Sequence, residues 1–379
     1  MGPMPAVPDA LTLYPAATHV ARGGRAASFD LEGRWLTFFE DGVLYKRALN
    51  GRVHLRWREV GRRQRRVIEA EAAAPLHARV RALAEAAWPG AEGEARRRLE
   101  DILGWDPSRL VAEKARFNAV YKPISILPPD RYLSVVLQAT EGCTWNRCTF
   151  CSFYAGRPFA AKPPEAFAAH ARAVRDFLGK NARLRKDIFL ADGNALALSE
   201  ARLLAILDRA RAAFPGRPVF GFIDLFTGER HPLSTWRRLK EAGLKGVYVG
   251  METGHDPLLA WLNKPGSQRE LLAFVADLKA AGLFVGLIVM VGVGGHTFRE
   301  RHFKETLEAL SAMPLEKGDV VFLSPFVEDP ASAYRARREA EGILPLRGDE
   351  VEAELKRFAG AVRALDLRAA RYDIREFLY

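Results

Sequence analysis

The most informative stretch of this chain is Leu133-Ser134-Val135-Val136-Leu137-Gln138-Ala139, which runs directly into Thr140-Glu141-Gly142-Cys143-Thr144-Trp145-Asn146-Arg147-Cys148-Thr149-Phe150-Cys151. Its first part is a short and mostly apolar run, which predicts a buried β-strand. Its second part holds every cysteine of the 379-residue chain within residues 143–151. Cysteines that serve only core packing would be scattered, so this grouping predicts a shared chemical role at the end of a strand.

The sequence after residue 131 repeats one pattern, in which a short apolar run is followed by an amphipathic helix. The helix expected at Pro164–Leu178 places Phe167, Val174 and Phe177 on one side. Near-continuous apolar strands are typical of a parallel sheet that helices cover. Right-handed crossovers curl such strands into a barrel, so the sequence predicts an α/β fold with an open (β/α)6 partial TIM barrel. The strands expected after the first are residues 188–190, 219–223, 246–250, 284–290 and 319–323.

The N-terminal third carries a different pattern, which predicts a small N-terminal α/β accessory region at residues 1–130. Residues 34–58 predict a β-meander, because Asp41-Gly42 and Asn50-Gly51 are turn dipeptides between β-rich runs. Residues 1–30 show no strong pattern and are expected to form a loosely attached arm. The remaining expectations are helices at 75–88 and 92–103, an extended proline-rich connection at 121–132, a core domain at 131–330, and a C-terminal helix and tail at 331–379.

The chain is strongly basic, with 57 Lys and Arg against 46 Asp and Glu, a net charge of +11 and a sequence pI near 9.7. Such a charge suits a nucleic-acid partner, but no recognised nucleic-acid module surrounds the arginine clusters. We therefore favour a solvated basic surface. No run of about 18 apolar residues predicts a membrane helix, and the N-terminal residues lack a signal-peptide pattern. The sequence predicts a cytoplasmic protein without a membrane partner.

Three cysteines in one loop are suited to hold one iron–sulfur cluster. A disulfide framework does not suit an odd number of cysteines in a cytosolic protein. Three thiolates bind three irons of a cubane cluster, and the chain has no fourth cysteine for the last iron. An open coordination position indicates chemistry, whereas a closed metal site usually indicates structure. Cys143, Cys148 and Cys151 are therefore the predicted ligands of a single catalytic [4Fe–4S] cluster.

The segment Glu141–Cys151 resembles the signature of the radical S-adenosylmethionine (SAM) superfamily, in which three cysteines follow the first strand of a partial barrel. The resemblance implies that SAM chelates the open iron. It also implies that an electron from the cluster cleaves SAM to methionine and a 5′-deoxyadenosyl radical, which takes a hydrogen atom from the substrate. An external electron donor such as flavodoxin or ferredoxin and a position near adenine for Phe150 are implied as well. The gap between Cys143 and Cys148 is one residue longer than in the commonest signature, so no subfamily follows from it.

Residues at the other predicted strand ends match further parts of this resemblance. Asp192-Gly193-Asn194 stands where the family has a Gly-Gly-Glu-like motif, so Asp192 would accept the methionine ammonium group of SAM. Gly250-Met251-Glu252-Thr253-Gly254 resembles a segment of the oxygen-independent coproporphyrinogen oxidases and the Elongator-type catalytic subunits, with Glu252 as an acceptor for ribose hydroxyls. The cofactor-binding residues implied in this way are Phe150, Asp192, Gly193, Asn194, Glu252, Val291 and Gly292.

Alternatives to a catalytic cluster are a zinc ion with His170 as its fourth ligand and a cluster that only transfers electrons. The lack of further cysteines disfavours auxiliary clusters and two-cysteine methylation, and no cobalamin-binding domain is visible before the barrel. Direct hydrogen abstraction is what remains. The substrate is unidentified, with a small molecule favoured over RNA and an RNA-modifying enzyme as the alternative. No catalytic residue is assigned.

Three further features of the sequence have more than one interpretation. Ser324-Pro325-Phe326, at the end of the sixth strand, is placed to line the substrate side. Lys264 is either functional or a solvated charge. The aromatic C-terminal tail either packs on the outside, which we favour, or covers the open barrel with Tyr372 or Tyr379 near the substrate.

Overall fold

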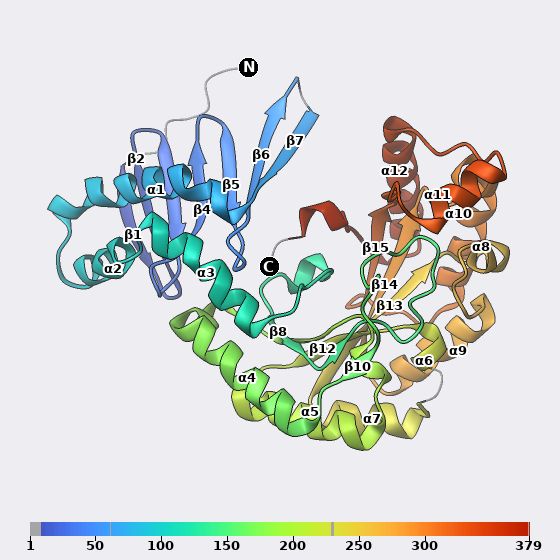
Figure 1. The fold of residues 1–379 in the computed structure, drawn as a ribbon. Coiled ribbons are helices and arrows are strands. Elements are labelled where there is room, and N and C mark those ends of the chain that lie inside the picture. Colours follow the sequence, from blue (N-terminus) through green and yellow to red (C-terminus); the bar gives the residue numbers. More distant parts are fainter. Residues whose placement is uncertain (1–8, 61, 229–230, 378) are drawn as a thin grey trace. The chain divides into compact units, whose positions relative to one another are not determined.

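The computed structural model describes residues 9–60, 62–228, 231–377 and 379. The chain divides into two compact units (Figure 1). The first contains the described residues up to Pro123, together with Ala173–Lys186 and Tyr379, and the second contains Ile124–Arg172 and Asp187–Phe377. The domain boundaries predicted after residues 130 and 330 stay predictions.

A seven-stranded antiparallel sheet, with its strands in sequence order, forms the framework of the first unit. The meander predicted at residues 34–58 is confirmed as three of these strands, and Asp41 and Gly42 turn between two of them with φ of 49° and 75°. Positive φ at both central residues suits the right-handed twist of a hairpin. The strands are β1 (Ala10–Tyr14), β2 (Ala17–Arg22), β3 (Arg25–Phe29), β4 (Trp35–Glu40), β5 (Val43–Arg47), β6 (Val53–Glu59) and β7 (Arg62–Ile68).

Residues 10–29 form strands β1 to β3, so the predicted loose arm is wrong over this range; residues 1–8 lie outside the described part of the chain. Val20 and Ala27 are paired and fully buried, while their neighbours His19 and Ser28 point to the opposite face. These strands are rich in Ala, Thr and Arg, so they lack the density of branched apolar residues that marks a strand in sequence. Pairing within the sheet decides their conformation.

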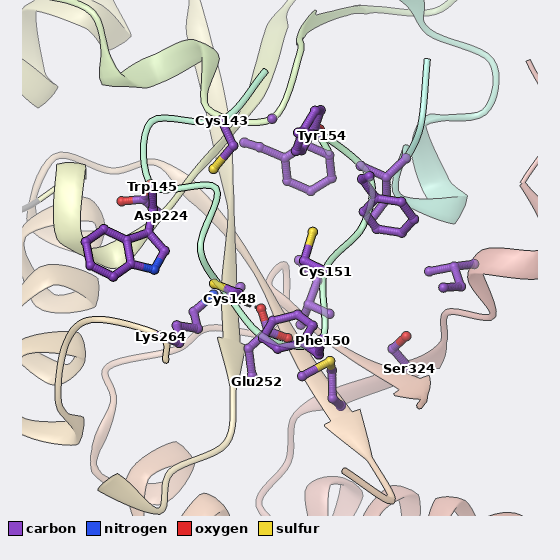
Figure 2. Close-up of a pocket in the computed structure, with 18 of the residues that line it drawn as sticks. Cys143, Trp145, Cys148, Phe150, Cys151, Tyr154, Asp224, Glu252, Lys264 and Ser324 are labelled. Atoms are coloured by element: carbon purple, nitrogen blue, oxygen red, sulfur yellow. Dashed lines mark hydrogen bonds and ion pairs between the residues drawn. The ribbon is translucent and has the colours of Figure 1, made fainter. Parts of the chain in front are cut away.

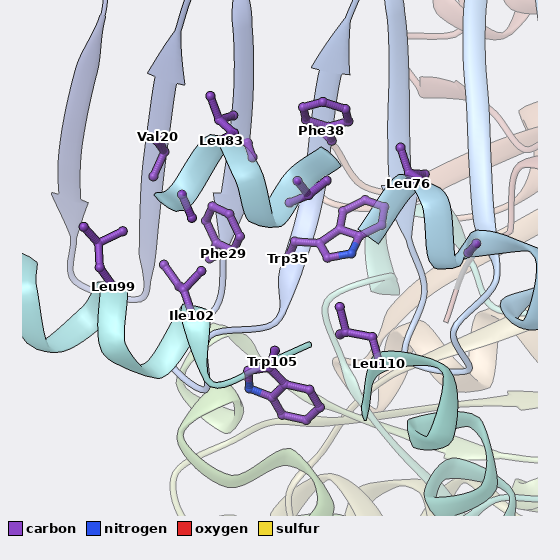
Figure 3. Packing of buried hydrophobic residues seen from close by; sticks show 14 of the residues in the cluster. Val20, Phe29, Trp35, Phe38, Leu76, Leu83, Leu99, Ile102, Trp105 and Leu110 are labelled. Atoms are coloured by element: carbon purple, nitrogen blue, oxygen red, sulfur yellow. The ribbon is translucent and has the colours of Figure 1, made fainter. Parts of the chain in front are cut away.

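Three helices pack on one face of this sheet and enclose its core (Figure 3). The helices predicted at 75–88 and 92–103 are confirmed as α1 (Ala74–Ala87) and α2 (Gly93–Leu103), and α3 (Pro107–Val120) was not predicted. Its start is marked in the sequence, because Asp106 caps the helix by accepting a 2.8 Å hydrogen bond from the Arg109 amide. The core combines Val20, Phe29, Trp35 and Phe38 of the sheet with Leu76 and Leu83 of α1 and Leu99 and Ile102 of α2.

A second sheet of seven parallel strands forms the second unit, and the order of its strands in space follows their order in the chain. Adding each strand on the same side of the last one curls the sheet toward a barrel. The two edge strands, first and last in sequence, do not pair with each other, so the barrel is open. The strands are β8 (Val135–Gln138), β11 (Ile188–Ala191), β12 (Val219–Ile223), β13 (Leu244–Glu252), β14 (Phe284–Val291), β15 (Val320–Pro325) and β16 (Arg368–Arg371).

The predicted α/β class with an open partial barrel is confirmed, and the structure adds β16 to the six expected strands. The sequence Arg-Ala-Ala-Arg of β16 carries no strand signal, because an edge strand of this length depends on its single partner β15. Two further short strands, β9 (Thr140–Glu141) and β10 (Ala160–Ala161), pair with each other and lie outside the parallel sheet.

Helices join the successive parallel strands, so the carboxyl ends of the strands share one rim of the sheet. None of the described helices is long and apolar enough to cross a membrane. They are α4 (Pro164–Leu178), α5 (Glu200–Ala213), α6 (Leu225–Gly228), α7 (Leu233–Glu241), α8 (Asp256–Trp261), α9 (Gln268–Ala280), α10 (Gly295–Ala312), α11 (Ala333–Ala340) and α12 (Gly348–Ala364).

Candidate functional site

A cavity of about 350 Å³ opens at the carboxyl ends of the parallel strands in the second unit. Its wall is mainly apolar, and the polar side chains in it come from several different strand ends, which is the usual arrangement of a barrel active site. Of the residues expected from sequence, the cavity brings together Cys143, Cys148, Cys151, Phe150, Gly193, Asn194 and Glu252.

The three cysteines lie on the single loop that follows β8, and Figure 2 shows their sulfur atoms around one shared space. Gly142 begins the loop with φ of 72°, and a Cβ at this position would lie 2.6 Å from the Arg157 carbonyl oxygen. Only glycine meets both demands. The pairing of β9 with β10 closes the base of the loop, so all three thiols are presented toward the cavity from a fixed frame.

The segment after α8 fastens the cysteine loop from the other side. The Trp145 indole donates a 2.8 Å hydrogen bond to the Asn263 carbonyl, and the Asn263 side-chain amide donates to the Arg147 carbonyl, also at 2.8 Å. The Thr149 amide donates to the Leu262 carbonyl at 3.0 Å. These contacts hold the part of the loop between the first and the last cysteine against a helix end.

The segment between the first two cysteines turns at Asn146. This residue has φ of 47°, a left-handed conformation that asparagine tolerates better than most residues. Its side-chain amide donates a 2.9 Å hydrogen bond to the Tyr154 carbonyl across the loop. The longer gap therefore forms a closed local turn, and it leaves both Cys143 and Cys148 on the cavity wall.

Burial sets the electrostatics of the thiols. It raises the pKa of Cys148 to about 12 and raises the pKa of Cys151 as well. A thiolate in such surroundings needs a nearby cation or metal ion to balance its charge. Three thiols of one loop that face one space are the donor set that an iron–sulfur cluster uses.

Asn194 links three strand ends at the edge of the cavity. Its side-chain amide donates to the Thr144 hydroxyl at 2.5 Å and to the Asp224 carboxylate, and its oxygen accepts a 2.7 Å hydrogen bond from the Asp224 amide. Asn194 follows β11, Thr144 belongs to the cysteine loop and Asp224 follows β12. The predicted site residue Asn194 therefore positions other groups, and Asp224 joins it on the cavity wall.

Asp192 lies just before Asn194 in the sequence. Its carboxylate is paired with Arg157, whereas the sequence predicted a contact with the ammonium group of SAM. Its side chain is 2% exposed. Its carboxylate accepts a 3.2 Å hydrogen bond from the Arg157 guanidinium, and the two groups also form an ion pair. Asp192 is not among the described residues that line the cavity, whereas the next residue, Gly193, is. A Cβ on Gly193 would lie 2.6 Å from the Tyr154 ring, so glycine allows the close packing of Tyr154 there. The proposed contact of Asp192 with SAM stays a prediction.

The pH dependence of stability should reveal the buried state of Asp192. Burial raises the pKa of its carboxyl to about 6, although the Arg157 guanidinium opposes that rise. The pKa is about 4 in an unfolded chain, so between these values the folded state binds the proton more tightly. The free energy of unfolding should therefore increase as the pH falls from about 6 to about 4, by on the order of 2 kcal/mol relative to Asp192→Asn. Urea unfolding at several pH values measures this, and parallel profiles for the two proteins would contradict it.

Glu252 and Lys264 form a buried ion pair at the end of β13. The Lys264 ammonium lies 2.8 Å from the Glu252 carboxylate, and the two side chains are only 11% and 10% exposed. Gly250 makes room for this pair, because a Cβ there would overlap the carboxylate. Both charged residues line the cavity, so Lys264 belongs to the site and is not a solvated surface charge.

Val291 and Gly292, predicted along the adenine, are not among the described residues of the cavity wall. Val291 is fully buried, and Gly292 has φ of 94°. A Cβ on Gly292 would lie 3.3 Å from a methyl group of Val351, which comes from α12. The C-terminal helix covers this glycine-rich turn, and its expected role in binding SAM stays a prediction.

The sixth strand and the C-terminal tail supply the wall on the other side. Ser324, Pro325 and Phe326 line the cavity as expected, together with Tyr372 and Ile374. Tyr372 is fully buried, its ring lies 5.7 Å from that of Phe322, and its hydroxyl has no hydrogen-bond partner among the described residues. The preference for outside packing of the tail is therefore wrong for Tyr372, because β16 carries the chain to the rim of the sheet.

Two histidines of the second unit, His170 and His231, have structural partners. The His170 ring accepts a 3.0 Å hydrogen bond from the Gln138 amide, and His170 is not part of the described cavity wall. This placement removes it as a fourth ligand in the zinc alternative. The His231 ring contacts the Leu196 carbonyl at 3.2 Å and packs edge-on against Trp236.

Sequence reasoning missed several residues that shape the site. Asn263 has φ of 53°, and its Asn-Lys-Pro-Gly context is a turn signal that would have marked it. Ile126 and Phe153 line the cavity without any sequence pattern that points to them. Such residues are placed by the path of the loop, which local sequence does not determine.

Comparison with known proteins adds independent information. A model of the radical SAM superfamily matches residues 137–310, and no curated protein matches the chain. Similar solved structures include the cobalamin-dependent SAM radical enzyme OxsB, at 14% identity over 66% of this chain and 33% of that chain, with a TM-score of 0.41. This chain thus spans about a third of the length of OxsB.

Two further similar structures are those of methylornithine synthase (PylB), at 15% identity, and coproporphyrinogen III oxidase (HemN) from Escherichia coli, at 14%. The alignment with methylornithine synthase covers 75% of this chain and 72% of that chain, with a TM-score of 0.44. The alignment with the oxidase covers 66% and 56%, with a TM-score of 0.45. Residues 137–310, which contain the cysteine loop, therefore match the radical SAM superfamily of enzymes.

Proposed function

We propose that this protein cleaves SAM reductively at a single [4Fe–4S] cluster and abstracts a hydrogen atom from an organic substrate. The observation that carries the proposal is the set of three thiols, from one loop, on the wall of one cavity. Three cysteine thiols on one cavity wall are the donor set of a cluster that would leave one iron for SAM. When bound, the cluster and SAM supply the electron and the 5′-deoxyadenosyl radical.

Residues of this chain bind and orient the cofactor in this proposal. Cys143, Cys148 and Cys151 hold three irons. Phe150 lies beside them on the apolar wall. Its ring packs against a group of buried hydrophobic side chains, which includes Leu258, Trp261, Met290 and Tyr334. Glu252 is the acceptor for hydroxyl groups of the ribose, and its ion pair with Lys264 orients its carboxylate. Asn194 and Asp224 fix the rim next to Thr144.

The rest of the cavity suits a small substrate. Its wall is apolar and excludes water from a reactive intermediate. The apolar side chains include Phe153, Met290, Phe326 and Ile374. The buried Tyr372 hydroxyl has no hydrogen-bond partner among the described residues. Leaving a buried hydroxyl unpaired costs free energy, so this hydroxyl would bind a polar group of the substrate. An external one-electron donor such as flavodoxin or ferredoxin would supply the electron to the cluster. The three cysteines form no disulfide, which suits a reducing, cytoplasmic compartment.

Anaerobic reconstitution with iron and sulfide, followed by SAM and dithionite, tests the proposal. The expected products are 5′-deoxyadenosine and methionine. Transfer of deuterium from labelled candidate metabolites into 5′-deoxyadenosine then identifies the substrate class.

A further inference from the structure

Two hydroxyl groups on the cavity wall are the feature from which a further inference follows. The described lining residues that carry a hydroxyl are Ser152, Tyr154, Ser324 and Tyr372. The Ser152 hydroxyl donates to the Asp329 carboxylate. The Tyr154 hydroxyl donates a 3.5 Å hydrogen bond to the Asp192 carboxylate. Within the described part of the chain, the hydroxyls of Ser324 and Tyr372 have no such partner.

Ser324 and Tyr372 are neighbours on adjacent parallel strands. Strands β15 and β16 pair as far as Leu323 and Arg371, and the Tyr372 amide continues the ladder by donating a 2.9 Å hydrogen bond to the Leu323 carbonyl. Residues at one level of paired strands point to the same face of the sheet. Ser324 is 6% exposed and Tyr372 is fully buried. The two hydroxyls therefore belong to one side of the cavity and are both removed from solvent.

The other polar side chains of the described wall are engaged, apart from the three thiols. The groups with partners include the Trp145 indole, the Asn146 amide, the linked pair Asn194 and Asp224, and the ion pair of Lys264 with Glu252. Lys264 is the only basic residue among the described residues that line the cavity. An anionic group in the cavity would therefore find no unpaired cation to balance its charge.

We propose that the hydroxyls of Ser324 and Tyr372 together bind one neutral oxygen atom, a carbonyl or an alcohol, on an otherwise apolar substrate. That this molecule is the substrate rests on the proposed radical chemistry. Each hydroxyl has one proton to donate, and an oxygen with two lone pairs accepts both. Figure 2 shows Ser324 well apart from Cys143 and Cys148, so this side of the cavity is left for a molecule other than the cluster.

The surroundings of the two hydroxyls fit a neutral ligand. Met290 pairs with Ser324 across β14 and β15 and lines the cavity, as do Phe326 and Ile374, so the body of the ligand meets apolar side chains. Burial raises the pKa of Tyr372 well above its usual value, and nearby tyrosines and carboxylates, Glu252 among them, raise it further. The hydroxyl therefore keeps its proton for donation, and its surroundings disfavour an anion.

Fluorine NMR on the full chain tests this site, with 4′-fluoroacetophenone as the probe. The chain is reconstituted with iron, sulfide and SAM and kept without reductant, and broadening of the fluorine signal gives the dissociation constant. Three matched probes carry a different group in place of the ketone: 4-fluorobenzoate, 4-fluorobenzamidinium and 4-fluoro-α-methylstyrene, in which CH2 replaces the oxygen. The ketone should bind at least about fivefold more tightly than each of them.

Substitutions assign this preference to the two hydroxyls. Ser324→Ala and Tyr372→Phe should each weaken binding of the ketone about two- to twelvefold and leave the affinity for the styrene unchanged. Tyr334→Phe is the matched control. The Tyr334 hydroxyl is buried but accepts a 2.9 Å hydrogen bond from the Gly294 amide, and Tyr334 does not line the described cavity wall. This variant should bind the ketone as the wild type does.

Unfolding in urea gives a second measurement that needs no probe. Tyr372→Phe should leave the urea midpoint unchanged or raise it, because the hydroxyl that it removes has no partner among the described residues. Tyr334→Phe should lower the midpoint, because it leaves the buried Gly294 amide without its acceptor.

Four results would overturn the inference. They are no binding of the ketone, binding of a charged probe at least as tight as that of the ketone, wild-type affinity for the ketone in both Ser324→Ala and Tyr372→Phe, and an equal fall of the urea midpoint in the two tyrosine variants. Formation of 5′-deoxyadenosine after dithionite is added separates the two proposals. Cleavage of SAM without selective binding of the ketone rejects only the recognition by these hydroxyls, and selective binding without cleavage rejects only the proposed chemistry.

Discussion

Replacement of Cys148 by serine should abolish cluster assembly. The wild type, reconstituted without oxygen, should retain about four iron and four sulfide per chain, whereas Cys148→Ser should retain neither. The reason is that the chain has only three cysteines, all in one loop, so no other thiol replaces the lost ligand. Iron and acid-labile sulfide analysis, together with the visible absorption of the cluster, measures the effect.

A neighbouring substitution provides the control for this result. Arg147 lies in the same loop but is exposed and does not line the cavity. Arg147→Gln should therefore keep the iron and sulfide content of the wild type. Retention of a full cluster by Cys148→Ser would show that Cys148 is not a ligand, and loss in both variants would show that the loop is merely fragile.

Lys264→Met should destabilise the second unit by about 3–5 kcal/mol, because it leaves the buried carboxylate of Glu252 without its partner. The ion pair is short, at 2.8 Å, and both side chains are about one-tenth exposed. The double variant Glu252→Gln/Lys264→Met removes both charges and should recover most of the loss. Chemical unfolding of the cluster-free protein measures the free energies.

An exposed lysine pair serves as the comparison. Lys304 lies 3.7 Å from Glu308, and their side chains are 69% and 55% exposed. Lys304→Met should change the free energy of unfolding by less than about 1 kcal/mol, since solvent screens such pairs. Equal effects of the two lysine substitutions would mean that Glu252 is stabilised by groups other than Lys264.

The sequence predicted the parts of the site that depend on strand ends. Cys143, Asn194 and Glu252 each follow an apolar run, and parallel strands bring such residues to one rim. Apolar periodicity is a local property, so it is visible in a single chain. The same argument located Ser324 on the cavity wall.

What the sequence left open depends on contacts between distant segments. Val291 and Gly292 also end a strand, but α12 covers that turn through Val351. Asp192 follows β11 as predicted, but its carboxylate forms an ion pair with Arg157, which lies on the cysteine loop. Tyr372 reaches the cavity only because the edge strand β16 forms, and its Arg-Ala-Ala-Arg sequence gives no sign of it.

The loop between the first two cysteines was likewise predicted only in part from the sequence. Its extra residue is visible in sequence, but the left-handed turn at Asn146 and the hydrogen bond to the Tyr154 carbonyl are not. The fastening of Trp145 to Asn263 links segments far apart in the chain. Such pairings follow from tertiary packing, which overrides local preference.

The most direct test of the central claim is a single anaerobic experiment on the reconstituted full chain with SAM and dithionite. The account predicts a cluster with about four iron and four sulfide per chain, and formation of 5′-deoxyadenosine and methionine in equal amounts. Cys148→Ser should form neither product, and Arg147→Gln should form both. Bound zinc without sulfide, or a complete cluster that yields no 5′-deoxyadenosine, would contradict the account.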